Sequence, residues 1–230
     1  MRSHLIALAA AGLLAACAAT TTATPAAAVL GVYVPTQVPY SDQASRVAAE
    51  QPAGAYALDS RHASVTWKIR HGGVGVFAAR FDTIAGTLNF NPQTPAASTI
   101  SATIAAASVN TGVLNNAGER AFDREIATQA FGSEANPEIR FVSRSAAVTG
   151  PTTGTITGEL TLNGVTKPVT LETSFEGGRF VQFRGKHVLG FSARGTFNRK
   201  DFSASLSNPI ADGFVSDTVE LEIHAEFIQQ

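Results

Sequence analysis

The sequence predicts an all-β antiparallel protein with one short helical insertion, and three observations lead to this class. First, stretches in which apolar and polar residues alternate recur between residues 64 and 227, which is the period of a strand with one buried face. Second, Asn163-Gly164 joins two such stretches and is a pair typical of tight β-hairpin turns. Third, Phe122, Ile126 and Ala130 recur every four residues within 118–131, which is helical spacing.

The strands are expected in the stretches where this alternation holds. In chain order they are 64–71, 84–90, 100–106, 139–143, 155–162, 165–175, 180–184, 189–197 and 219–227. Asn91-Pro92 and Pro95 separate the second stretch from the third. The last stretch is the most regular, because its apolar residues alternate with Glu220, Glu222, His224 and Glu226.

The hairpin around Asn163-Gly164 carries the clearest local signal. A two-residue loop would place Leu162 opposite Val165, so both strands would turn their apolar residues to the same side. Lys167 nevertheless falls on the apolar face, and Pro168 cannot donate a ladder hydrogen bond. The second strand is therefore expected to be an edge, or to carry a bulge, near Pro168.

The N-terminal residues 1–17 are interpreted as a targeting segment. The apolar run Leu5–Leu14 is too short to span a bilayer, and it ends in Leu14-Ala15-Ala16-Cys17, which resembles the lipobox of bacterial lipoproteins. Cys17 is the only cysteine of the chain, so it has no disulfide partner and its acylation is expected. The alternative is a secretory signal cleaved further on, such as after Ala28.

Residues 18–55 are rich in Ala, Thr and Pro and are expected to be a tether, followed by a folded domain over 56–229. More than one acyl chain would hold the protein firmly at a membrane surface. Ala18, rather than Asp, follows the cysteine, which resembles sorting to the outer membrane. The expected location is therefore the periplasmic face of a bacterial envelope, with the chain anchored as an outer-membrane lipoprotein.

Several motifs occur in an order that resembles one known family. They are Tyr56-x-Leu58-Asp59-x-x-His62-x-Ser64, Pro137-x-Ile139-x-Phe141-x-Ser143, GELTLNGVTKPVTL at 158–171, Arg199-Lys200-Asp201-Phe202 and Val215-Ser216-Asp217-x-Val219. Together they resemble the YceI-like, or polyisoprenoid-binding, family over Tyr56 to Phe227. The alternation alone leaves open a packed β-sandwich or a hollow barrel. The resemblance implies a lipocalin-like extended barrel whose apolar lumen holds an isoprenoid or other lipid chain.

Enzymatic chemistry finds no support in the sequence. The histidines are scattered without metal-ligand spacing, and no serine lies in a Gly-x-Ser-x-Gly elbow. Gly72-Gly73-Val74-Gly75 lacks the remaining residues of a phosphate-binding loop and is interpreted as a flexible turn at the lip of the barrel. With 17 basic and 18 acidic residues, the chain gives no reason to expect nucleic acid as a partner. We expect neither a catalytic residue nor a metal or other cofactor.

The candidate ligand-binding residues are the bulky ones at inward strand positions. They are Trp67, Ile69, His71, Phe90, Phe141, Phe175, Phe191 and Phe197. The alternative is that the apolar seven are mutual core contacts. His71 is either a core histidine bonded to a backbone carbonyl or a polar contact to a quinone or head-group oxygen.

These features are compatible with three functions. The favoured one is binding, and either sequestering or carrying, an isoprenoid lipid or quinone in an apolar lumen. The second is a non-enzymatic envelope stress protein with a packed sandwich core that acts through a protein partner. The third, a hydrolase or isomerase acting on bound lipid, has the least support. A homodimer is left open.

Overall fold

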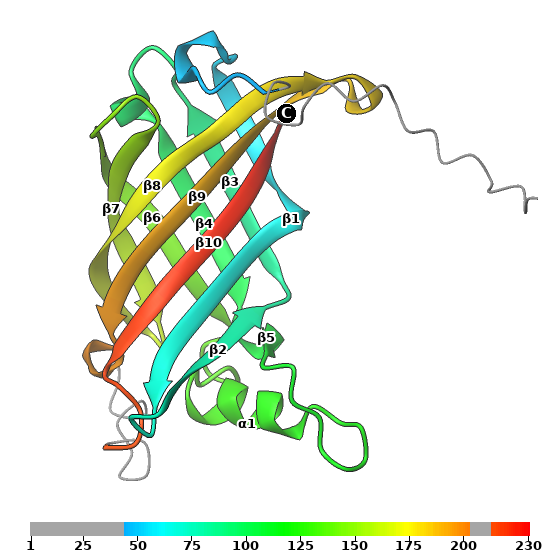
Figure 1. Cartoon of the computed structure of the whole chain (residues 1–230), viewed down its shortest axis with the longest axis vertical. Coiled ribbons are helices and arrows are strands. Elements are labelled where there is room, and N and C mark those ends of the chain that lie inside the picture. The colour runs from blue at the N-terminus through cyan, green and yellow to red at the C-terminus, as the bar shows by residue number, and fades with distance from the viewer. Residues whose placement is uncertain (1–43, 203–212) are drawn as a thin grey trace, which may run out of the picture. The chain divides into compact units, whose positions relative to one another are not determined.

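The computed structural model describes residues 44–202 and 213–230, which form an antiparallel β-barrel with a helix across one end (Figure 1). The strands are β1 (Gly54–His71), β2 (Gly75–Phe81), β3 (Ile84–Phe90), β4 (Thr99–Ala105), β5 (Val109–Asn110), β6 (Glu138–Val148), β7 (Thr153–Leu162), β8 (Val165–Val181), β9 (Lys186–Asn198) and β10 (Thr218–Gln229). The α-helix is α1 (Ala121–Gln129), and the short 3-10 turns are η2 (Ala48–Glu50), η3 (Pro95–Ala97), η4 (Ala106–Ser108), η5 (Gln182–Arg184) and η6 (Arg199–Asp201).

The barrel closes because its first and last strands pair. The strands follow the order β10-β9-β8-β7-β6-β4-β3-β1, and β10 also pairs with β1 along most of its length, for example Trp67 with Leu221. The result is a closed eight-stranded antiparallel barrel, extended at one end by β2 and β5. The predicted all-β barrel with one helical insertion is confirmed. Closure pairs the first strand with the last and leaves only short unpaired edges, which is how such folds avoid edge-to-edge aggregation.

The β7–β8 hairpin has the predicted register. Leu162 pairs with Val165, and the loop residues Asn163 and Gly164 both have positive φ, 52° and 77°. Pro168 pairs with Glu159 of β7, whereas the pairing of β8 with β9 begins only at Leu171. Pro168 thus lies on a locally unpaired edge, where its missing N–H costs no ladder hydrogen bond.

Several elements differ from the prediction: β1 begins at Gly54, β2 and β5 were not predicted, and β8 is one strand that continues to Val181. The strand expected over 180–184 is wrong beyond Val181, because 182–184 form η5 and Gly185 reverses the chain in the left-handed region at φ 62°. Residues 44–53, assigned to the tether, lie against the barrel: Ser45 bridges to Gly178 and Gln51 is buried. The last two tether residues, Gly54 and Ala55, belong to β1. Residues 1–43, with the targeting segment, Cys17 and most of the tether, lie outside the described residues.

Two apolar clusters occupy the interior. The larger one lies toward the α1 end and includes Trp67, Phe81, Phe131 and Leu162. The smaller one lies toward the opposite end and consists of Tyr56, Leu88, Phe90, Phe175, Leu189 and Phe227. No helix in 44–202 or 213–230 combines the length and hydropathy needed to cross a membrane.

Gly158 is a position where two neighbouring strands leave no room for a side chain. A Cβ built there would lie 2.4 Å from the Phe141 ring and 2.7 Å from the Val142 carbonyl oxygen. We expect Gly158→Ala to lower the free energy of unfolding by about 1–3 kcal/mol, because backbone and ring must both shift. Urea unfolding checks this. Gly190→Ala is the control: its nearest neighbours would lie at 3.6 Å or more, so equal losses in the two variants would contradict the steric explanation.

Candidate functional site

A cavity of about 690 Å³ occupies the barrel between the two ends, and its wall is almost entirely apolar. Barrels of this strand number hold either a filled core or one small ligand, depending on the size of the inward side chains. Here several inward positions carry only a methyl group, at Ala63, Ala102, Ala193 and Ala225. These alanines leave open the space that larger residues would fill, so the lumen is hollow.

One end of the lumen is closed by an aromatic cluster. The Phe175 and Phe191 rings lie 5.3 Å apart between centroids, and Phe90 lies 6.3 Å from Phe191. Tyr56 is fully buried beside them and donates a hydrogen bond of 2.7 Å to the Pro52 carbonyl oxygen. Burial raises the pKa of this phenol, so it stays neutral. A smaller cavity of about 130 Å³ lies at this end.

The other end is the mouth, which α1 partly covers (Figure 1). The helix contributes Phe122, Glu125, Ile126 and Gln129 to the cavity wall. Phe77 of β2 also lines the cavity. None of these residues is among the site residues predicted from the sequence, although the four-residue spacing of Phe122 and Ile126 indicates an apolar helix face that needs a partner.

The structure brings six of the eight predicted site residues to the main cavity. They are Trp67, Ile69, His71, Phe141, Phe191 and Phe197. Phe90 and Phe175 belong instead to the aromatic cluster that closes the far end, where they line only the smaller cavity. The lumen narrows there because large rings from several strands meet. Phe90 and Phe175 are therefore core residues that contact each other, and they do not form part of the wall of the main cavity.

His71 lies at the mouth, at the end of β1. Its ring is exposed and packs edge-on against Phe214 at 4.6 Å between centroids. No hydrogen bond of the ring occurs among the described residues, so the buried, carbonyl-bonded alternative does not describe it. A histidine at this position can donate to or accept from the polar end of a ligand whose tail lies in the lumen.

The Arg199–Phe202 motif closes the turn after β9. Arg199 is buried, pairs with Asp217 at 3.0 Å and donates to the Ser216 carbonyl oxygen at 3.1 Å. Phe202 is buried against Phe197, with ring centroids 5.1 Å apart. The motif therefore closes the turn with an ion pair, while Arg199 itself lines the cavity and Phe202 belongs to the larger apolar cluster.

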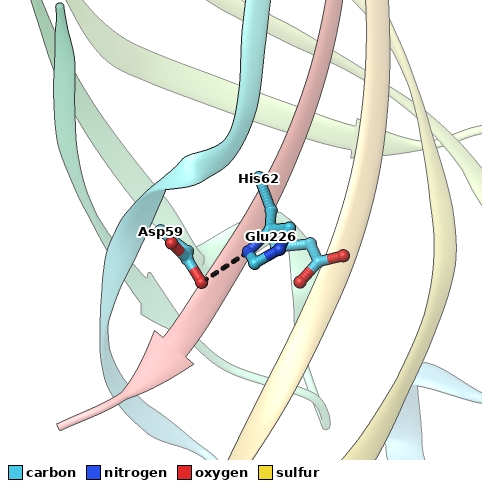
Figure 2. Close-up of side chains that lie close together, drawn as sticks. All are labelled: Asp59, His62 and Glu226. Carbon is cyan, nitrogen blue, oxygen red and sulfur yellow. Dashed lines mark hydrogen bonds and ion pairs between the residues drawn. The ribbon is translucent and has the colours of Figure 1, made fainter. Parts of the chain in front are cut away.

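The Asp59-x-x-His62 motif forms a separate polar cluster on the outer wall (Figure 2). The β1–β10 register passes from Leu58–Phe227 to Ala63–Ala225, so a bulge of residues 59–62 lies opposite Glu226 alone. Asp59, His62 and Glu226 each place a donor atom within 4.8 Å of the others, a spacing that could hold a metal ion.

The contacts of Asp59 indicate a structural role. Its buried carboxylate accepts hydrogen bonds from the Arg61 N–H at 3.1 Å, from His62 Nδ1 at 2.9 Å and from Arg184 Nη1 at 2.7 Å. Burial alone would raise the pKa of Asp59, but these hydrogen bonds and the Arg184 charge outweigh it and lower the pKa to about 2. The Arg184 guanidinium supplies the positive charge that a metal ion would otherwise bring. Because Arg184 belongs to η5, its ion pair with Asp59 joins the bulge to η5.

The fold and the apolar lumen define the class of protein: a lipocalin-like antiparallel barrel built around a cavity. The model of the YceI-like domain family matches residues 56–227. The chain belongs to this family.

Relatives and solved structures agree with this assignment. A UPF0312 protein of Pseudomonas putida (strain W619) is 36% identical over 186 residues, covering 80% of this chain and 91% of the relative. A UPF0312 protein of Pseudomonas fluorescens (strain SBW25) is 34% identical over 181 residues, covering 77% and 88%.

Two solved structures share the fold. The YceI protein of Campylobacter jejuni superposes with a TM-score of 0.58 at 26% identity, covering 71% of this chain and 91% of that one. A polyisoprenoid binding domain from Saccharophagus degradans superposes with a TM-score of 0.55 at 14% identity, covering 76% and 98%.

Proposed function

We propose that this protein binds a long-chain isoprenoid lipid, either a polyisoprenoid or a quinone, in its lumen, and that it sequesters or carries this lipid in the bacterial envelope. The observation that carries the proposal is the hollow apolar cavity of about 690 Å³. The polyisoprenoid binding domain that shares the fold supports the choice of ligand class.

The energetics favour a chain-like ligand. Each CH₂ group removed from water contributes about 0.8 kcal/mol, so a hydrocarbon tail binds without directed polar contacts. Among the polar residues that line the cavity, His71, Glu125 and Gln129 lie at the mouth, whereas Ser64, Thr173, Ser192 and His224 lie further along the barrel. This arrangement suits a ligand with an apolar tail in the lumen and a polar head at the mouth, as in a quinone.

We place this binding protein at the periplasmic face of the envelope, held by acylation of Cys17, and we assign it no catalytic step. The support is the lipobox-like Leu14–Cys17 sequence, together with membership of the YceI-like domain family. Mass spectrometry of the protein from its native membrane tests the anchor. Acyl groups on an N-terminal Cys17 support it, and an N-terminus further along the chain contradicts it.

Native mass spectrometry of protein purified without detergent tests the binding function. A mass excess that disappears on denaturation and equals that of an isoprenoid lipid supports the proposal. A bare mass that stays unchanged after incubation with quinones and polyprenols overturns it.

His71→Ala is expected to weaken the binding of a quinone while leaving the binding of squalene, a hydrocarbon without a head group, unchanged. The loss of one hydrogen bond corresponds to about 1 kcal/mol, or roughly a fivefold change in Kd. Fluorescence titration with both ligands measures the ratio. An equal loss for both ligands would mean that His71 acts by shaping the mouth instead of contacting a head group.

A further inference from the structure

Exposed apolar side chains gather around the mouth of the lumen. Val74, in the β1–β2 turn, is 92% exposed, and Val76, Phe122 and Phe214 are also exposed; these four residues are called the mouth rim below. They come from the β1–β2 turn, β2, α1 and the segment before β10, which meet at one end of the barrel. Such a set of apolar groups on the surface of a protein marks an interaction site.

The mouth rim is continuous with the lumen through a chain of rings. Phe214 packs on His71 at 4.6 Å between centroids, His71 lies 6.5 Å from Phe77, and Phe77 lies 5.7 Å from Trp67 deep in the cavity wall. Phe77 also contacts Phe122 of α1 at 6.0 Å. An apolar path thus leads from the outermost side chains to the interior.

Backbone hydrogen bonds hold the mouth rim in place. The Gly72 N–H donates to the Phe214 carbonyl oxygen at 2.7 Å, and the Ser216 N–H donates to the Arg70 carbonyl oxygen at 3.0 Å. Phe214 is therefore fixed beside the β1–β2 turn. The side chain of Arg70 is exposed across the ladder from Val76 and makes no ion pair among the described residues.

We propose that the mouth rim docks on the surface of a lipid bilayer, so that the ligand passes between membrane and lumen without crossing water. This inference rests on the proposed function, because an isoprenoid must come from and return to a membrane. Apolar and aromatic side chains partition into the bilayer interface, and a long cationic side chain such as Arg70 reaches lipid phosphates from beside them. Continuity of the rim with the lumen favours a bilayer over a protein partner as the occupant.

The first test is a fluorescent label on the rim. Cys17 is the only cysteine, so the full chain with Cys17→Ser accepts a bimane label at Val74→Cys or, as the control, at Val148→Cys. Val148 is also an exposed valine, 59% exposed, but it lies at the closed end, where β6 finishes. Phosphatidylcholine vesicles with a minority of phosphatidylglycerol should shift the emission of the label at 74 to the blue and leave the label at 148 unchanged.

Three outcomes overturn the docking proposal. The first is the absence of a shift at 74, and the second is an equal shift at both positions. The third is a shift at 74 that depends on protein concentration without vesicles, which would assign the mouth rim to contact between copies of the chain. Because these vesicles contain no isoprenoid, the result is independent of whether the lumen binds one.

The second test measures exchange of a fluorescent isoprenoid between donor and acceptor vesicles. Val74→Asp in the same Cys17→Ser chain should slow exchange about tenfold, corresponding to about 1.4 kcal/mol, while the amount bound at equilibrium stays the same. Val148→Asp should change neither quantity. Normal loading with an unchanged rate would overturn the docking proposal alone, whereas no loading in the parent chain would overturn the proposed function.

Discussion

Replacing Ala193 with Trp should abolish most lipid binding and leave the barrel as stable as before. Ala193 lines the cavity from β9, and an indole there would occupy the space of several ligand CH₂ groups. At about 0.8 kcal/mol for each excluded CH₂, the loss of three or four groups raises the Kd on the order of a hundredfold. Isothermal titration with a quinone measures the affinity, and urea unfolding measures the stability.

The same substitution separates a hollow barrel from a packed core. In a filled core an added indole would be overpacked and would cost about 1–3 kcal/mol of unfolding free energy. In the open lumen the indole gains contacts without displacing neighbours. Ala78→Trp is the control, because Ala78 is exposed on β2 and should leave the affinity unchanged. A destabilised Ala193→Trp, together with a ligand-free parent protein, would favour the packed alternative.

Asp59→Ala should lower the free energy of unfolding by about 2–3 kcal/mol. The substitution removes three hydrogen bonds and leaves the largely buried Arg184 guanidinium without this carboxylate. Glu222→Ala is the comparison: that carboxylate pairs with Lys68 in a more exposed setting, so its loss should be clearly smaller. Denaturant unfolding at neutral pH compares the two variants. Equal losses of unfolding free energy in the two variants would contradict the conclusion that the Asp59 contacts stabilise the barrel through the bulge.

The stability contributed by Asp59 should also disappear in acid. Its pKa is about 2 in the folded state, below the ordinary 3.8, so the folded state favours the ionised form. The contribution is complete above about pH 4 and is lost as the pH falls toward 2, because the unfolded chain takes up the proton first. At 1.36 kcal/mol per pKa unit it amounts to about 2 kcal/mol. Asp59→Ala should therefore show a shallower loss of stability between pH 4 and pH 2.

The elements and their inward faces could be predicted from the sequence because they depend on local rules. Apolar alternation identified most of the strands, although not β2 or β5. The two-residue turn Asn163-Gly164 set the register that pairs Leu162 with Val165. Pro168 has no backbone N–H to donate to a ladder, and this correctly indicated a local edge of the sheet. The spacing of Phe122 and Ile126 identified α1, although not the mouth that the helix covers.

Tertiary structure decided what these faces enclose. A filled sandwich and a hollow barrel need the same alternation, and closure depends on β1 pairing with β10, far away in the chain. Phe175 and Phe191 follow one pattern, yet only Phe191 reaches the main cavity, because the lumen narrows where the rings of several strands meet. The bulge that brings Asp59 and His62 opposite Glu226 likewise has no local signal, since its register is set by the partner strand.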